Sequence, residues 1–153
     1  MDVLYLFHRY KDDVYRLAVN YTRNPQEAED VCQTVFLKLL EQDQLIPGKE
    51  KAWLMQVTAN ECRNLLKSGW WKRTVPLEAA QETYRDNTDE TRYMVQKLPP
   101  KYRVVIYLRY YAQYTVPEIG KLLQIPTSTV TTRLQRGREK LRKTMKEIGR
   151  AHV

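Results

Sequence analysis

Apolar residues recur at spacings of three and four along most of the 153-residue chain, which is the pattern of amphipathic helices. The first stripe lies in residues 2–22, and a second follows Asn24 and Pro25 and continues to about Glu41. Asn24 is expected to cap the second helix, with Glu27 reaching back to the cap amide. The positions expected to face inward from these two helices are Val3, Phe7, Val14, Leu17, Ala18, Tyr21, Ala28, Val31, Cys32, Val35, Phe36 and Leu39.

A third helix is expected over residues 51–67, after a loop of residues 42–50 that contains Pro47 and Gly48. Its expected inward positions are Ala52, Trp53, Val57 and Leu65. Residues 77–91 are polar and acidic and lack clean periodicity, which is typical of a linker, in part helical.

A second helical unit is expected to begin at Pro99 and Pro100. Its first helix is predicted by the apolar positions Val104, Val105, Leu108 and Tyr111. A short helix over residues 116–123, a turn over 124–126 and a long basic helix over 127–148 follow.

The composition agrees with helices, since the chain has only 5 glycines and its 7 prolines lie mostly between the periodic segments. The sequence therefore predicts an all-α fold of two small helical domains joined by a flexible linker. The expected parts are an N-terminal bundle over 1–76, a linker over 77–95 and a helix-turn-helix domain over 96–153.

The helix-turn-helix prediction depends on five apolar residues in the second unit. Ile119 and Leu123 are expected to hold the first helix to the core, and Ile125 to fill the turn. Val130 and Leu134, four residues apart, are expected to anchor the second helix. The side chains then available to DNA are Ser128, Thr131, Thr132, Arg133, Gln135, Arg136 and Arg138. A plain helical hairpin shows the same apolar spacing, but the basic run after it favours DNA binding.

The net charge of +8 is concentrated in two blocks. Residues 121–153 contain nine basic and two acidic residues, and residues 49–73 contain six and two. The segments before and between these blocks include acidic stretches, so the chain is expected to carry two surfaces for a polyanion. The other interpretation of each block is a solvated helix face.

No motif in the sequence indicates an enzyme, although the residues alone leave a nuclease built on carboxylates open. His8 and His152 lie at opposite ends, the acidic clusters lack metal-ligand spacing, and no phosphate-binding loop or nucleophile motif occurs, so no cofactor or metal is expected. Cys32 and Cys62 are expected to be free buried thiols, although spacing alone leaves a disulfide open. No segment suits a signal peptide or a membrane span, so the protein is expected in the cytoplasm, without membrane insertion.

Three motifs, in this order along the chain, give a family resemblance. They are Glu27-Ala28-Glu29-Asp30-Val31-Cys32-Gln33-Thr34-Val35-Phe36, the segment 53–64 (Trp-Leu-Met-Gln-Val-Thr-Ala-Asn-Glu-Cys-Arg-Asn), and Leu98-Pro99-Pro100-Lys101-Tyr102-Arg103 followed by the helix-turn-helix. Together they resemble the extracytoplasmic-function (ECF) sigma factors of bacterial RNA polymerase. The resemblance implies that the chain binds core RNA polymerase and promoter DNA, recognising a −10 and a −35 element. An anti-sigma factor is the further partner it implies.

The resemblance also implies roles for particular residues. The polymerase-docking face would contain Asp30, Gln33, Thr34 and Lys38. The −10 surface would contain Gly48, Lys49, Lys51, Asn60, Arg63, Asn64 and Lys67, with a flipped base received by the loop. The helix-turn-helix residues would read −35 duplex, although Thr131 and Thr132 stand where the family often has a basic residue. Trp53 is expected in the core, and Trp70 and Trp71 either stack on DNA or pack the linker.

Two other functions agree with the same residues. A stand-alone helix-turn-helix regulator would bind duplex DNA tightly without polymerase. A polymerase-associated adaptor would bind the enzyme without promoter specificity. Run-off transcription with core polymerase separates them, since only a sigma factor yields promoter-specific transcripts.

Overall fold

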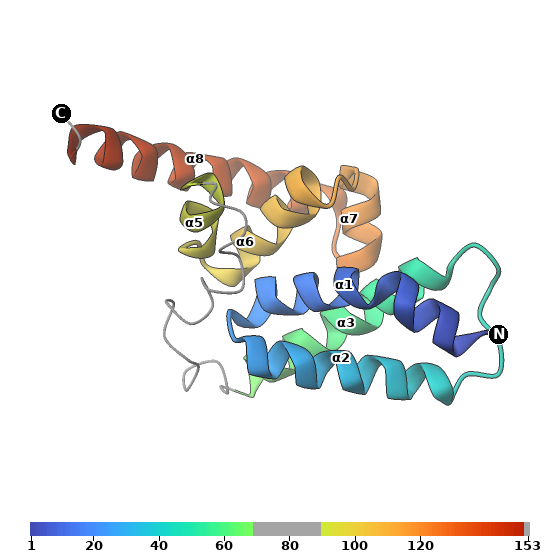
Figure 1. The fold of residues 1–153 in the computed structure, drawn as a ribbon. Helices are drawn as coiled ribbons and strands as arrows, with labels where there is room; N and C mark the ends of the chain where they lie inside the picture. The colour runs from blue at the N-terminus through green and yellow to red at the C-terminus, as the bar shows by residue number, and fades with distance from the viewer. Residues whose placement is uncertain (69–89, 152–153) are drawn as a thin grey trace. The chain divides into compact units, whose positions relative to one another are not determined.

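The computed structural model describes residues 1–68 and 90–151, the side chains of 90–92 and 148–151 excepted. The chain divides into two compact units, Met1–Thr83 and Tyr84–Val153, which are treated separately below. All the regular elements within the described ranges are helices, as Figure 1 shows, which confirms the all-α fold class. No helix in these ranges is long and apolar enough to cross a membrane.

The first unit is a bundle of three helices, α1 (Val3–Thr22), α2 (Pro25–Leu40) and α3 (Glu50–Lys67). Each helix packs against the other two (Figure 1). The core is aliphatic, and its fully buried members include Val14, Leu17, Ala18, Val19, Ala28, Val35, Leu39, Leu54 and Ala59. The burial of these side chains holds together three helices that would be marginal in isolation.

The corner between α1 and α2 follows from local capping. Arg23 ends α1 in the left-handed conformation, with φ 54°, and its amide donates to the Val19 carbonyl at 2.7 Å. The Asn24 side chain accepts from the amides of Gln26 and Glu27, so the predicted cap is confirmed. The Asn24 amide donates to Thr22 Oγ1 at 3.2 Å, however. The expected hydrogen bond from the Asn24 amide to the Glu27 side chain is therefore wrong, because the Thr22 hydroxyl at the end of α1 already accepts from that amide.

The inward faces of α1 and α3 differ from the prediction. Phe7 is 37% exposed, and its neighbour Leu6 is buried in its place. In α3, Ala52 is exposed and Trp53 is only half-buried. Val57 and Leu65 are also half-buried, and the buried positions are Leu54, Met55, Thr58, Ala59 and Cys62. The inward face of α3 is set by the groove between α1 and α2, which the spacing of apolar residues within α3 does not determine.

The second unit contains α5 (Glu90–Gln96), α6 (Pro100–Ile106), a π-helical turn (Tyr107–Tyr111), α7 (Val116–Leu123) and α8 (Thr127–Ala151). Helix α5 packs on α6 and α8, with Met94 and Val95 buried. It occupies the end of the segment expected as a linker, whose remainder, 77–89, lies outside the described residues, as do Trp70 and Trp71.

Residues after Ile106 do not continue the expected α-helix to Tyr111. The amide of Ala112 donates to the Tyr107 carbonyl at 3.0 Å, which is the five-residue spacing of a π-turn. The wider turn keeps Leu108 buried and leaves Tyr110 50% exposed.

Candidate nucleic-acid interface

Helices α7 and α8 form the predicted helix-turn-helix. Thr115 caps α7 in a reciprocal box, since its hydroxyl accepts from the Glu118 amide while the Glu118 carboxylate accepts from the Thr115 amide. Gln124 ends the helix with φ 58°. A Cβ on Gly120 would lie 3.0 Å from the Ile125 carbonyl oxygen, so the turn closes tightly because position 120 has no side chain.

Helix α8 is fixed to the rest of its unit by one apolar face. Val130, Leu134 and Leu141 are buried, as the spacing predicts for the first two. Gly137 lies on the same face, and a Cβ there would come within 3.0 Å of Ile106 Cγ1. Glycine at this position allows α8 to approach α6 closely, which determines the face of α8 that remains at the surface.

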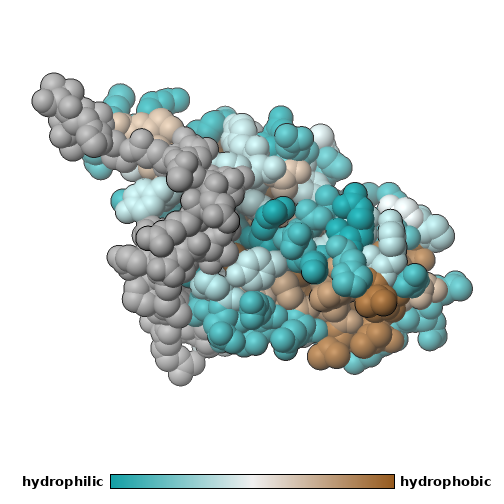
Figure 2. Space-filling model, in the orientation of Figure 1, coloured by the Kyte–Doolittle hydropathy of each residue, from teal (hydrophilic) through white to brown (hydrophobic). Residues whose placement is uncertain are grey.

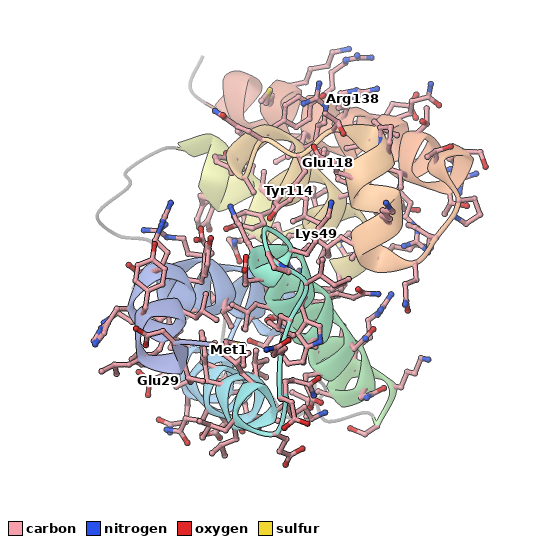
Figure 3. The ribbon with its side chains drawn as sticks, turned by 90° about the vertical axis from the view of Figure 1, so that its right-hand side faces the viewer. Met1, Glu29, Lys49, Tyr114, Glu118 and Arg138 are labelled. Carbon is pink, nitrogen blue, oxygen red and sulfur yellow. The ribbon has the colours of Figure 1, made fainter. Side chains whose placement is uncertain are left out.

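The side chains expected to read duplex DNA lie on the remaining surface of α8. Six of them, Ser128, Thr131, Thr132, Gln135, Arg136 and Arg138, are exposed, and Arg133 is half-buried. The Thr132 hydroxyl donates to the Ser128 carbonyl at 2.9 Å. Arg138, labelled in Figure 3, donates to the hydroxyl of Tyr110 at 2.8 Å. Arg138 is therefore partly engaged by its own unit, although it is exposed.

Sequence reasoning missed two residues beside this face, Lys101 and Tyr102 of α6. They line a hollow of about 320 Å³ together with Ser128, Thr129, Thr132, Arg133 and Arg136. Burial by itself would raise the pKa of the Tyr102 phenol, but the charge of Lys101 and hydrogen bonds from Arg136 and Lys101 lower it below its ordinary value. The sequence carried no signal for these two residues, because their place beside α8 depends on how α6 packs against α8.

The −10 residues expected on α3 share one face of that helix. Asn60 and Asn64 are four residues apart, and Arg63 and Lys67 repeat the interval. All four lie away from the buried positions, and Arg63 Nη2 donates to Asn60 Oδ1. Trp53 belongs to the same face, since it precedes Asn60 by seven residues. Trp53 is only half-buried rather than in the core as expected, so part of its aromatic surface is available beside the polar residues.

The loop before α3 holds the remaining −10 residues. Gly48 has φ +82°, a conformation that favours glycine, and its amide donates to Glu50 Oε1 at 3.1 Å. Lys49, labelled in Figure 3, is exposed and Lys51 is half-buried. The loop and the first turns of α1 border a concavity of about 480 Å³ lined by Met1, Asp2, Tyr5, Leu6, Tyr10, Gln44, Leu45, Pro47 and Glu50.

The residues expected to dock on polymerase lie on α2. Asp30, Gln33 and Lys38 are exposed and Thr34 is half-buried. Lys38 forms an ion pair with Glu61 of α3. Partial burial and the nearby charge of Asp30 raise the pKa of Glu27 above its ordinary value.

An apolar groove adjoins the docking residues, and the sequence analysis did not predict it. Its volume is about 580 Å³, and its walls are Val3, Leu4, Phe7, Gln33, Phe36, Leu37 and Leu40. Leu4, Leu37 and Leu40 are each at least 60% exposed. The brown side chains gathered at the lower right of Figure 2 show this surface over α1 and α2. The sequence signal was that Leu37 and Leu40 fall outside the inward stripe of α2.

Cys32 and Cys62 are free thiols. Burial, together with nearby Glu29 and Asp12, raises the pKa of Cys32 to about 12, and burial raises that of Cys62 further. Within the described ranges, no cluster of three His, Cys, Asp or Glu residues is placed to hold a metal ion.

Known families match both units. Residues 6–72 match Sigma-70 region 2, and residues 88–141 match Sigma-70, region 4. The chain is 31% identical over 163 residues to the ECF RNA polymerase sigma factor SigW of Bacillus subtilis (strain 168), a match that covers 91% of this chain and 86% of SigW. It is 27% identical to the RNA polymerase sigma factor SigV of the same organism, over 87% of this chain and 84% of SigV.

Solved structures agree on the fold. The sigma factor RpoE from Bartonella quintana, in complex with the anti-sigma factor NepR, matches with a TM-score of 0.69 and 16% identity, over 92% of this chain and 94% of that one. CnrH, in complex with the cytosolic domain of CnrY, matches with a TM-score of 0.69 and 22% identity, over 95% and 88%.

The two matched regions and the helix-turn-helix define a sigma-70-type transcription-initiation factor, which directs RNA polymerase to promoters. The chain belongs to the ECF RNA polymerase sigma factors.

Proposed function

We propose that the two units divide promoter recognition between them, the first meeting polymerase and the −10 element and the second meeting the −35 duplex. The observation that carries this proposal is the exposed polar and basic face of α8, opposite its anchors Val130 and Leu134. A recognition helix of a helix-turn-helix enters the major groove with such a face. Arg136 is the best-placed side chain to fork onto a guanine edge, because it is exposed on this face of α8.

The α3 face is proposed to bind the single-stranded −10 element. Asn60 and Asn64 offer carboxamides that can donate to and accept from base edges, while Arg63 and Lys67 offer charge to phosphates. Trp53, half-buried on the same face, adds an aromatic surface on which a base can stack. Gly48, Lys49 and Lys51 belong to the loop proposed to receive the flipped base.

The docking surface for core polymerase is proposed to combine the exposed polar residues of α2 with the apolar groove. Gln33 belongs to both, since it is one of the docking residues and lines the groove. An exposed apolar patch of this kind rimmed by polar groups is typical of a protein interface. Core polymerase is the occupant, because the chain is a sigma factor and the groove lies along α2 within the matched region 2.

Three further points belong to the same proposal. An anti-sigma factor is proposed as a regulatory partner, since the sigma factor RpoE, which has the same fold, forms a complex with the anti-sigma factor NepR. The protein is proposed to work in the cytoplasm, where promoter DNA and polymerase are. The chain itself is proposed to catalyse no reaction.

A stand-alone helix-turn-helix regulator is the less favoured alternative, because such a regulator does not need the region 2 unit.

Run-off transcription with bacterial core polymerase on a promoter library tests the division of roles. The chain is expected to yield a defined set of transcripts whose −35 sequences change with substitutions in α8 and whose −10 sequences change with substitutions in α3 or the loop. If substitutions in α8 changed the −10 sequences, and substitutions in α3 or the loop changed the −35 sequences, the assignment of the units would be contradicted. Identical transcripts from all variants would contradict the site residues.

A further inference from the structure

Lys101, Tyr102 and Arg136 surround the hollow between the first turns of α6 and α8 described above. Three cations, Lys101, Arg133 and Arg136, line it, and among its described lining residues there is no carboxylate. Lys101 and Tyr102 lie outside the set of residues that the helix-turn-helix pattern assigns to DNA. The hollow therefore extends the basic surface of α8 onto a second helix.

Tyr102 joins these cations into a preformed arrangement. Only 8% of this residue is exposed, and its Cβ packs beside Gly137. Lys101 and Arg136 act on its phenol and lower the phenol pKa below its ordinary value, although burial alone would raise it. The ammonium of Lys101 lies 5.1 Å from the centroid of the same ring, and that of Lys140 lies 5.7 Å from it. A cation held in this way loses less side-chain entropy when it binds a ligand.

The chemistry of the hollow suits a phosphate group. Guanidinium and ammonium groups donate strong hydrogen bonds to phosphate oxygens. The Thr132 hydroxyl has its hydrogen engaged by the Ser128 carbonyl, so the donors must come chiefly from the cations. The hollow also borders Thr132 and Arg136, two residues expected to meet duplex DNA.

We propose that this hollow binds one backbone phosphate of the −35 duplex, with Lys101 contacting the phosphate and Tyr102 holding the Lys101 ammonium beside it. The inference rests on the proposed DNA binding by α8. Such a contact carries no base information, but it fixes the register of the recognition helix on the duplex.

The test uses core polymerase loaded with the full chain, and duplexes in which one −35 phosphate at a time is replaced by an uncharged methylphosphonate. At one position the replacement is expected to weaken wild-type binding by roughly threefold to tenfold, and Lys101→Gln is expected to abolish this penalty. Lys101→Gln is also expected to reduce the slope of log K against log salt by about 0.9, without changing base preference. Lys146→Gln, which removes an exposed cation further along α8, is the matched control and should keep the penalty.

Tyr102→Phe separates positioning from packing, because it keeps the ring and removes only the phenol oxygen on which Lys101 and Arg136 act. The methylphosphonate penalty is expected to fall in part, while the melting temperature stays unchanged. The inference is wrong if wild-type holoenzyme selects −35 sequences but no phosphate is coupled to Lys101. Displacement of the duplex by millimolar inorganic phosphate, at constant ionic strength and without such coupling, would assign the hollow to free anions instead. Failure of the wild type to select any −35 sequence would overturn the proposed function, and this inference with it.

Discussion

Lys38 of α2 and Glu61 of α3 form an ion pair between the helix proposed to meet polymerase and the helix proposed to meet single-stranded DNA. Both side chains belong to the first unit, and the Lys38 side chain is 46% exposed. An ion pair at such an exposed place stabilises a fold by only about 0.2–1 kcal/mol. Lys38 is therefore available for a second partner at little cost to the bundle.

The Lys38–Glu61 ion pair predicts that swapping the two charges will affect stability and polymerase binding differently. The double variant Lys38→Glu with Glu61→Lys should recover the stability that either single variant loses, since the pair is restored with reversed order. Core binding should not recover, because Lys38 is proposed to face polymerase. Urea unfolding and a fluorescence titration with core enzyme measure the two quantities. Recovery of both would assign Lys38 a purely structural role.

The apolar groove predicts a substitution that weakens polymerase binding without destabilising the fold. Leu37→Asp places a charge on a residue that is 60% exposed, so the free energy of unfolding should change by less than about 0.5 kcal/mol. Binding to core polymerase should weaken at least about tenfold, because the charge would be buried in an apolar interface.

Ile46→Asp is the matched control for the groove, since Ile46 is 72% exposed and does not line it. It should leave the affinity for core enzyme unchanged. An equal loss of affinity in both variants would show that general surface charge, rather than the groove, determines docking.

Arg136→Ala is expected to reduce discrimination among −35 sequences and nothing else. A bidentate contact to the correct base is worth about 1–3 kcal/mol, so discrimination among −35 sequences should fall by roughly tenfold or more. Core binding should be intact, because Arg136 is not in the first unit. Promoter-library transcription and a core-binding titration give the two readouts, and equal loss in both would contradict the proposed role of Arg136.

Much of this architecture could be predicted because its determinants are local. Asn24 caps α2, and the short helix Val116–Leu123 has the bounds that the pattern predicted. The errors in the buried faces of the helices came from contacts made across the fold. Phe7 satisfies the stripe of α1 but lines a groove, and Trp53 is only half-buried because of the way α3 fits between α1 and α2.

In the candidate site, too, the features that depend on one helix could be predicted and those that depend on packing between helices could not. The recognition residues follow from the period of α8, so their exposure could be predicted, and the structure places six of the seven on the surface. Lys101 and Tyr102 could not be predicted as neighbours of Arg136, because the close approach of α6 depends on Gly137 and its contact with Ile106. That approach is a property of packing between two helices rather than of either helix pattern.

The Cys32 thiol predicts a pH dependence of stability. Its pKa is raised in the folded protein from an ordinary value of 9.0 to about 12, so folding favours the protonated thiol. The contribution is fully present below about pH 9 and is lost as the pH rises from there toward 12. Because tyrosines and lysines titrate in the same range, the measurement is the difference in the free energy of unfolding between wild type and Cys32→Ser at several pH values. The gap between the two proteins should be constant from pH 7 to 8.5 and should change against the wild type above pH 9. A gap independent of pH up to 10.5 would show that Cys32 ionises alike in the folded and unfolded chains.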